Sequence, residues 1–198
     1  MWTIGITGSI ATGKSTLLEA FGKCGVPVFS ADKAVAELYA GEAVAPVEAL
    51  FPGVARNGAI DRAELARRLA ADPSGFSRLE ALVHPLVRQR IARFLAEAEK
   101  AGHALAVVEV PLLFESGHDY GFDAIAVTHV DEAIQNERIM ARPGMTVEKR
   151  DALLARQLPQ AEKMRRAAYL FDTARPRAEI EAMVAALVDR VRAGQEER

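Results

Sequence analysis

Apolar residues along the chain are grouped into short runs that are separated by stretches with helical spacing. Residues 2–6 alternate between apolar and small side chains, and two almost fully apolar runs occupy 104–110 and 124–130. Runs of this length are typical of strands that are covered on both faces of a sheet. Shorter apolar segments at 28–30 and 169–172 predict two further strands.

Helical spacing predominates between residues 31 and 102. Asp61 is expected to cap one helix, with Glu64 placed three residues later to complete a capping box. The last part of this stretch predicts a longer helix with one apolar side. Its apolar positions are Leu82, Leu86, Ile91 and Leu95, and the breaks between the helices are Pro52-Gly53, Asn57-Gly58 and Asp72-Pro73.

The alternation of strands and helices predicts an α/β fold with a doubly wound, parallel, five-stranded sheet. Ligands of such sheets bind beyond the carboxyl ends of the strands. The helical block at 31–102 has the size of an inserted substrate-binding subdomain, and the charged segment at 132–159 has the character of a lid. The whole chain, 1–198, is expected to be one domain, with core segments at 1–30, 103–131 and 160–193.

Composition and charge limit the classes of protein to which the chain can belong. Half of the residues are hydrophobic and 26% are charged, as in an ordinary globular protein. The 25 basic and 27 acidic residues give a net charge of −2, so no overall basic field favours nucleic acid. Cys24 is the only cysteine, which agrees with a reducing compartment, and we expect it to be a small packing residue. With no bilayer-spanning run and no signal peptide, a cytoplasmic location is expected.

A phosphate-binding motif follows the first predicted strand. Residues 8–15, GSIATGKS, fit the pattern G-x-x-x-x-G-K-[ST] without a mismatch. Gly8 and Gly13 allow the loop to curl with its N–H groups pointing inward, Lys14 adds a mobile positive charge, and Ser15 offers a hydroxyl to Mg²⁺. The motif predicts a P-loop that binds a nucleoside triphosphate. The expected contacts are Gly8, Ser9, Ile10, Ala11, Thr12, Gly13, Lys14, Ser15 and Thr16.

Asp32 and a pair of arginines point to phosphoryl transfer. Asp32 follows the second predicted strand, where its carboxylate is placed either to accept a proton from an acceptor hydroxyl or to cap the next helix, and position alone does not decide. Arg138 and Arg142 are four residues apart, on one face of a predicted helix, and can neutralise charge on a transferring phosphoryl group. Ion pairs with Glu132 or Glu137 on a solvated helix are the alternative.

Further motifs, in this order, carry a family resemblance. They are Leu79-Glu80 and His84-Pro85, the P-L-L-F-E box at 111–115 after the third strand, the arginine pair, and then Gln157 and Lys163. Together with the P-loop, T-G-S-I-A-T-G-K-S-T at 7–16, they make the chain resemble the dephospho-coenzyme A kinases over nearly its whole length. The P-loop alone is widespread, but this combination is highly specific.

The resemblance implies transfer of the ATP γ-phosphoryl group to the ribose 3′-hydroxyl of dephospho-coenzyme A, giving coenzyme A and ADP. It implies Asp32 as the catalytic base, with Lys14, Arg138 and Arg142 acting on the phosphates and Arg142 also contacting ATP. Mg²⁺ would be held by Ser15 and the triphosphate, with Glu109 acting through water. The acceptor contacts would be Asp32, His84, Pro111, Leu112, Leu113, Phe114 and Glu115.

Several of these assignments have structural alternatives. His84, at a predicted turn that starts a helix, suits a structural hydrogen bond as well as an acceptor contact, and Leu112, Leu113 and Phe114 suit the core as well as an acceptor-facing wall. Ser30, Glu109 and Thr173 depart from the residues that the family tends to have. His103, His118 and His129 lack metal-ligand spacing.

Two other functions compete with this one. Another small nucleoside or nucleotide as acceptor would keep the same fold, and a regulator that uses the P-loop as a switch would need a protein partner. The chain has no N-K-x-D-like motif of GTPases, and the paired arginines argue against a switch. The expected partner is the small molecule dephospho-coenzyme A, without nucleic acid or membrane, and the expected state is a monomer or weak homo-oligomer.

Overall fold

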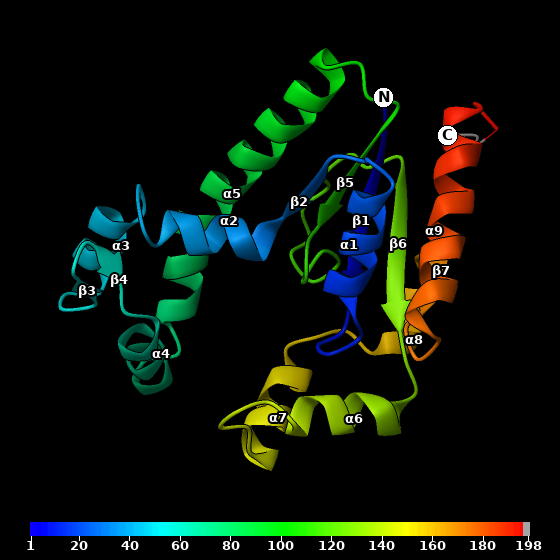
Figure 1. Ribbon diagram of the computed structural model, residues 1–198. Coiled ribbons are helices and arrows are strands. Elements are labelled where there is room, and N and C mark those ends of the chain that lie inside the picture. Colours follow the sequence, from blue (N-terminus) through cyan, green and yellow to red (C-terminus); the bar gives the residue numbers. More distant parts are fainter. Residues whose placement is uncertain (196–198) are drawn as a thin grey trace. The chain divides into compact units, whose positions relative to one another are not determined.

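A five-stranded sheet with the strand order β2-β5-β1-β6-β7 organises the computed structural model, which describes residues 1–195 (Figure 1). The strands are β1 (Trp2–Gly8), β2 (Val28–Ser30), β5 (Leu105–Glu109), β6 (Ala124–His129) and β7 (Tyr169–Asp172). β1 pairs in parallel with β5 and β6, and β6 pairs in parallel with β7. The five predicted strands form, and the predicted α/β fold class is confirmed.

The chain divides into two compact units, one of residues 30–96 and the other of residues 1–29 with the chain from 97 onward. The helices are α1 (Lys14–Lys23), α2 (Ala31–Leu38), α3 (Val44–Leu50), α4 (Arg62–Ala71), α5 (Gly75–Lys100), α6 (Glu132–Met140), α7 (Val147–Ala155), α8 (Gln160–Arg165) and α9 (Arg177–Arg192). Within the described residues, no helix has the length and apolar character needed to cross a bilayer.

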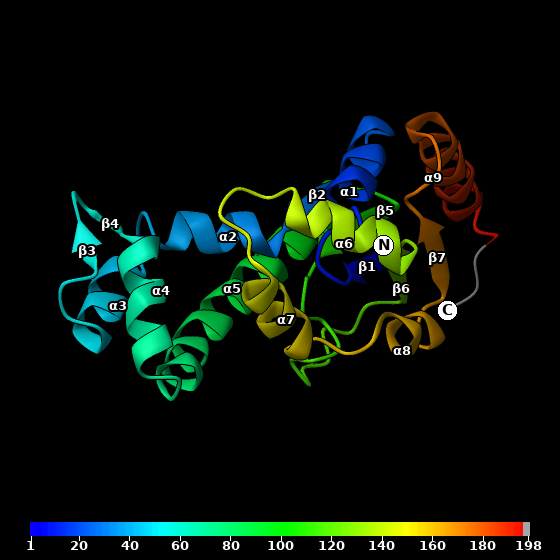
Figure 2. The same ribbon diagram turned by 90° about the horizontal axis from the view of Figure 1, so that it is seen from below.

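The alternation along β1 decides which residues face the core of the larger unit. Ile4 and Ile6 are fully buried in a cluster with apolar side chains of α1 and α9, which pack against each other beside the sheet (Figures 1 and 2). Cys24 packs against this cluster, as predicted. Gly5 and Thr7 have the opposite phase. Thr7 Oγ1 donates a hydrogen bond to Pro111 O at 3.1 Å, and Gly5 lies against the ring of Phe122.

A short hairpin interrupts the helices of the smaller unit. β3 (Ala55–Arg56) and β4 (Ala59–Ile60) pair antiparallel around Asn57-Gly58, whose φ angles of 51° and 79° are both positive. A type I′ turn needs positive φ at both of its central positions, and Asn-Gly is its preferred pair. The sequence predicted a break in the helices at this point but not the hairpin, because strands of two residues carry no readable alternation.

Asp61 caps α4 as predicted, since its Oδ1 accepts hydrogen bonds from the amides of Ala63 and Glu64 at 3.0 Å. The predicted capping box is wrong. The Glu64 carboxylate pairs with Arg67 and Arg68, and the hydrogen bonds from these guanidinium groups lower the pKa of Glu64 to about 2. The Asp61 amide, which a capping box would use, donates to a backbone carbonyl of the preceding segment at 2.8 Å instead. The carboxylate of Glu64 pairs with the two arginines one turn away on its own helix.

The predicted phase of α5 is off by one residue for most of its length. Its buried side chains follow a stripe of Leu79, Val83, Val87 and Ile91, whereas Leu82, Leu86 and Leu95 are half-buried. Pro85 lies inside the helix, so the turn expected at His84-Pro85 is wrong, and His84 is exposed on a continuous helix. Proline usually ends a helix. Here the helix continues past Pro85, because the apolar side chains before and after it are buried along the same face.

We predict that Gly5→Ala lowers the free energy of unfolding by about 1–3 kcal/mol, because overpacking a buried sheet face forces neighbouring groups to shift. The new methyl carbon would lie 2.4 Å from Cδ2 of Phe122. Denaturant titration measures the change. The matched control is Gly22→Ala in α1, where the nearest atom would be at 3.7 Å. Equal stability of the two variants would contradict this packing.

Candidate active site

The loop between β1 and α1 ends in a helix start that suits an anion. Gly13 is the N-cap of α1 with φ 81°, and no side chain caps the helix. The first intrahelical hydrogen bond runs from Leu17 N to Gly13 O at 3.2 Å, so the amides of Ser15 and Thr16 precede it. Amides at a helix start carry partial positive charge and attract phosphate oxygens. The loop therefore has the electrostatic form that its sequence predicts.

Hydroxyl groups beneath the loop fix its curvature. Thr12 Oγ1 donates to Ser9 O at 2.8 Å and lies 2.8 Å from Thr128 Oγ1 of β6. Thr128 Oγ1 also lies 3.4 Å from Thr7 O, so its single proton is shared between these two acceptors. A Cβ on Gly8 would come within 2.3 Å of Thr128 Oγ1. Gly8 is thus required for this close approach as well as for its φ of 154°.

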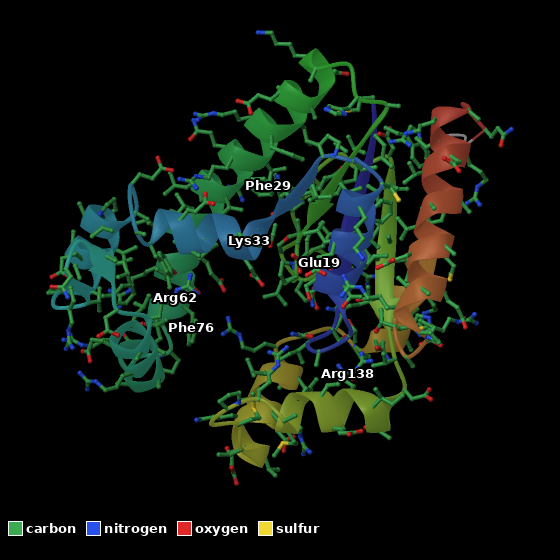
Figure 3. All side chains as sticks on the ribbon, in the orientation of Figure 1. Glu19, Phe29, Lys33, Arg62, Phe76 and Arg138 are labelled. Atoms are coloured by element: carbon green, nitrogen blue, oxygen red, sulfur yellow. The ribbon has the colours of Figure 1, made fainter. Side chains whose placement is uncertain are left out.

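Thr173, directly after β7, joins the loop to α6. Its buried hydroxyl donates to Thr12 O at 2.8 Å. Arg138, which is labelled in Figure 3, donates from Nη1 to Thr173 Oγ1 at 3.2 Å and from Nη2 to Thr173 O at 2.9 Å. The alternative in which Arg138 pairs with a glutamate of its own helix is therefore wrong. Arg138 is therefore connected to the phosphate loop through Thr173, which is hydrogen-bonded to both Arg138 and Thr12.

Arg142 does not share a helix face with Arg138. α6 ends at Met140, and the Arg142 amide closes a turn by donating to Ile139 O at 3.1 Å. The Arg142 side chain is exposed, whereas Arg138 is half-buried. Pro143-Gly144 follows, and proline and glycine after a helix favour its end at this point. The two arginines accordingly differ in their surroundings, and one of them is held by Thr173.

Lys14 lies over the mouth of the loop. Its Nζ donates to Gly8 O at 3.0 Å and to Ser9 O at 3.1 Å. Ser15, the second residue of α1, is exposed, and Glu109, the last residue of β5, is buried. A hydroxyl and a carboxylate suit Mg²⁺, which in phosphoryl-transfer sites takes few protein oxygens and several from phosphates and water. Over residues 1–195, no cluster of three or more His, Cys, Asp or Glu side chains has an arrangement for a metal.

Asp32 does not cap α2. The N-cap is Ser30, whose hydroxyl accepts a hydrogen bond from the amide of Lys33 at 3.4 Å. Asp32 lies in the first turn of the helix with an exposed side chain. Ser30, which departs from the family pattern, thus takes the capping role that the sequence left open for Asp32. Asp32 and His84 both belong to the unit of residues 30–96.

The segment after β5 is anchored by a buried ion pair. Lys163 of α8 is fully buried, and its Nζ lies 2.7 Å from Glu115 Oε1, which also accepts from the amide of Leu158 at 2.8 Å. Within the described residues, Glu115 Oε2 has no hydrogen-bond partner. Glu115 thus connects the segment 111–115 to α8 through Lys163 and to the end of the predicted lid through the Leu158 amide, so it has a structural role in addition to its predicted one.

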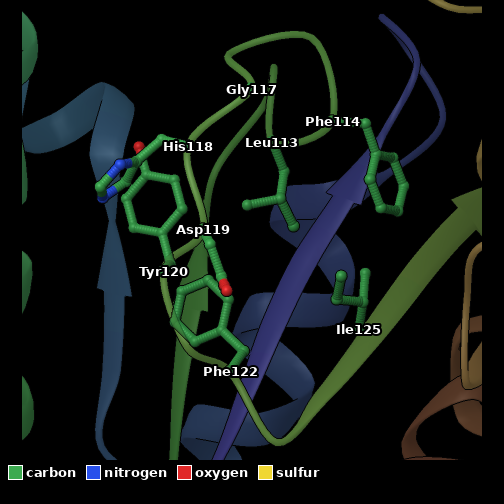
Figure 4. A pocket seen from close by; sticks show the side chains of 8 residues that line it. All are labelled: Leu113, Phe114, Gly117, His118, Asp119, Tyr120, Phe122 and Ile125. Atoms are coloured by element: carbon green, nitrogen blue, oxygen red, sulfur yellow. The ribbon is translucent and has the colours of Figure 1, made fainter.

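Next to this anchor is a cavity of about 270 Å³ (Figure 4). Leu113 is buried and Phe114 half-buried, and the guanidinium of Arg166 lies 5.6 Å from the centre of the Phe114 ring. These surroundings are consistent with both of the roles predicted for Leu113 and Phe114, as core residues or as a wall that faces the acceptor. The residues that line the cavity are Leu113, Phe114, Gly117, His118, Asp119, Tyr120, Phe122 and Ile125.

Comparison with known proteins identifies the family. The sequence model of the dephospho-CoA kinases matches residues 2–177. The chain belongs to the dephospho-CoA kinase family. A dephospho-CoA kinase of Rhizobium etli is 50% identical over 188 residues, which are 95% of this chain and 93% of that protein. The family resemblance predicted from the sequence motifs is therefore confirmed.

Solved structures agree with this membership. The crystal structure of TT1252 from Thermus thermophilus is 33% identical and has a TM-score of 0.79 over 95% of this chain and 97% of that one. The dephospho-CoA kinase from Campylobacter jejuni is 26% identical and has a TM-score of 0.73 over 98% of each chain.

Sequence analysis did not predict which residues outside the P-loop form hydrogen bonds with its backbone. The loop that begins at Thr173 was marked for attention because it directly follows a predicted strand at the carboxyl edge of the sheet, but Thr173 itself was given no role. Gln157 was noted only as a family position, and Gln135 was not singled out. Gln135 is buried one turn before Ile139, so a polar residue on the apolar face of α6 was also readable.

We predict that Lys163→Met lowers the free energy of unfolding by about 3–5 kcal/mol, because it leaves a largely buried carboxylate without its partner. The double variant Glu115→Gln with Lys163→Met should recover most of this loss, since the amide oxygen still accepts from Leu158. Denaturant titration tests both. Lys23→Met is the control, because its ion pair with Glu181 is exposed and should contribute less than about 1 kcal/mol. Similar losses in the two single variants would exclude a special role for the buried pair.

Proposed function

We propose that the protein transfers the γ-phosphoryl group of ATP to the 3′-hydroxyl of the ribose of dephospho-CoA. The bond from phosphorus to the β–γ bridging oxygen breaks, a bond from phosphorus to the ribose 3′-oxygen forms, and the hydroxyl proton passes to a carboxylate. The products are coenzyme A and ADP. The observation that carries the proposal is the P-loop, with its uncapped helix start, in a chain of this family.

Asp32 is proposed as the general base. Two observations support this role: its carboxylate is exposed, and Ser30 rather than Asp32 caps α2. A base must reach the hydroxyl that it deprotonates, so the carboxylate has to be available to the acceptor. We further propose the unit of residues 30–96 as an acceptor-binding part, with exposed His84 as a candidate contact. In the other unit, the half-buried Leu112 and Phe114 are candidate contacts.

The donor phosphates are assigned to the P-loop. Its amides and Lys14 bind the β- and γ-phosphates, and Ser15 would hold Mg²⁺, with Glu109 acting through water. The metal ion, when bound with ATP, offsets the negative charge of the phosphate oxygens. Lys14 already lies on the loop carbonyls of Gly8 and Ser9, within reach of any phosphate in the loop.

The arginines are proposed to have different roles. Arg138 is bound to Thr173 through two hydrogen bonds and is suited to a fixed electrostatic role behind the loop. Exposed Arg142 is suited to contact the phosphates as charge develops during transfer. We also propose a cytoplasmic location and a monomer or weak homo-oligomer.

Mass spectrometry after incubation with dephospho-CoA and MgATP tests the proposed reaction. We expect a product heavier by about 80 Da, one phosphoryl group, together with one ADP for each product molecule. A panel of other nucleosides and nucleotides as acceptors should give little product. Efficient transfer to another acceptor, with none to dephospho-CoA, would contradict the proposal.

We predict that Asp32→Asn lowers kcat by about a hundredfold or more, because the amide cannot take the proton, while the affinity for ATP is retained. Steady-state kinetics and nucleotide titration separate the two effects. Glu37→Gln removes a similar charge from an exposed site on the same helix and should change kcat little. An unchanged kcat for Asp32→Asn would exclude it as the base.

We predict that Arg142→Ala lowers kcat more than it raises the KM for ATP, because its contact strengthens in the transition state. Arg138→Ala should instead also weaken ATP binding, since it releases Thr173 behind the loop. Kinetics with ATP as the varied substrate distinguish the two variants. Equal changes in kcat and KM for both would contradict this division of roles.

A further inference from the structure

Two glutamines hold the backbone of Ile10, in the middle of the P-loop. The Ile10 amide donates to Gln157 Oε1 at 2.9 Å, and the Ile10 carbonyl accepts from Gln135 Nε2 at 2.9 Å. Gln135 lies on α6 and is buried, whereas Gln157 follows α7 and is half-buried. The predicted lid, 132–159, therefore binds one residue of the phosphate loop near each of its two ends.

The residue after Ile10 has an unfavourable backbone conformation, which these two hydrogen bonds help to maintain. Ala11 has a φ of 63°, in the left-handed region that residues with a Cβ avoid. The φ of Ala11 is set by the orientation of the peptide plane between Ile10 and Ala11, and Gln135 binds the carbonyl of that plane. A backbone conformation of this kind persists only where neighbouring groups hold it. The glutamines supply such neighbours on both sides of the Ile10 Cα.

Gln157 is itself held in place by its surroundings. The next amide, of Leu158, donates to Glu115 Oε1, which is paired with buried Lys163. Gln160 bonds to both the amide and the carbonyl of Val130, at 3.2 and 2.7 Å. The end of the lid segment is thus anchored to the core independently of the P-loop. Gln157 can therefore fix Ile10 rather than follow it.

We propose that Gln135 and Gln157 are positioning residues that hold Ala11 in its left-handed conformation and so keep the P-loop in the shape that binds nucleotide phosphates. The inference rests on the proposed role of this loop as the ATP site. It adds a specific cause for nucleotide affinity: the two ends of the segment 132–159 stabilise the loop at Ala11, its non-glycine residue with positive φ. Neither glutamine needs to contact the nucleotide for this.

A rescue experiment separates this role from a general contribution to stability. Gln135→Leu and Gln157→Leu should each raise the dissociation constant of ADP by about five- to tenfold, the usual effect of one lost hydrogen bond. Adding Ala11→Gly should bring each constant back to within about twofold of the unsubstituted protein, because glycine adopts positive φ without a penalty. Calorimetric titration with ADP measures these constants without any chemical step.

Gln160→Leu is the control, because it removes two hydrogen bonds to the backbone of Val130 but none to the P-loop, whereas each of the other leucine variants removes one bond to the P-loop. Any loss of ADP affinity in this variant should not be rescued by Ala11→Gly. Gln135→Lys keeps a donor to the Ile10 carbonyl and should retain more affinity than Gln135→Leu. If Gln135→Leu does not fold, the exposed part of Gln157 makes Gln157→Leu the deciding variant.

Two outcomes would overturn the inference while leaving the proposed function intact. One is unchanged ADP affinity in both leucine variants, and the other is a loss of affinity that Ala11→Gly does not restore. By contrast, absence of ADP and ATP binding by the unsubstituted protein would contradict the proposed function and this inference together.

Discussion

The hydrogen bond from Thr173 to the carbonyl of Thr12 is the contact on which the arrangement of the nucleotide site depends. It joins the last strand of the sheet to the loop that follows the first strand, and Arg138 binds the same hydroxyl from α6. Thr128 adds a second hydroxyl from the strand between them. A loop with positive φ at Ala11 and Gly13 would otherwise have many other conformations open to it. The parallel sheet thus brings residues far apart in sequence to one edge, where they fix the loop.

The central features of the fold were predictable because their signals are strong and local. The runs at 104–110 and 124–130 contain β5 and β6, and G-x-x-x-x-G-K-S marked the turn from β1 to α1. Asp61 was recognised as a cap from its position alone. The family resemblance rested on residues that stand together in sequence, such as the P-L-L-F-E box. Such signals need no knowledge of the tertiary structure.

The features that sequence reasoning missed depend on tertiary contacts or on competition between partners. The phase of α5 follows Val83 and Val87 because the packed face, not the count of leucines, decides which side is buried. Glu64 had a plausible backbone partner but pairs with two arginines. Arg142 was placed on a helix that ends two residues earlier. The contacts of Gln135 and Gln157 with Ile10 span more than a hundred residues, and no local pattern predicts their partner.

The affinity for ATP of Thr173→Val, compared with Thr173→Ser, tests this account most directly. Valine keeps the shape of the side chain but removes the hydroxyl that binds both Thr12 and Arg138, whereas serine retains it. The account predicts that the ATP dissociation constant rises by about tenfold or more for valine, from the loss of two hydrogen bonds, and by much less for serine. Equal and unchanged affinities in the two variants would contradict the claim that this hydroxyl holds the phosphate loop.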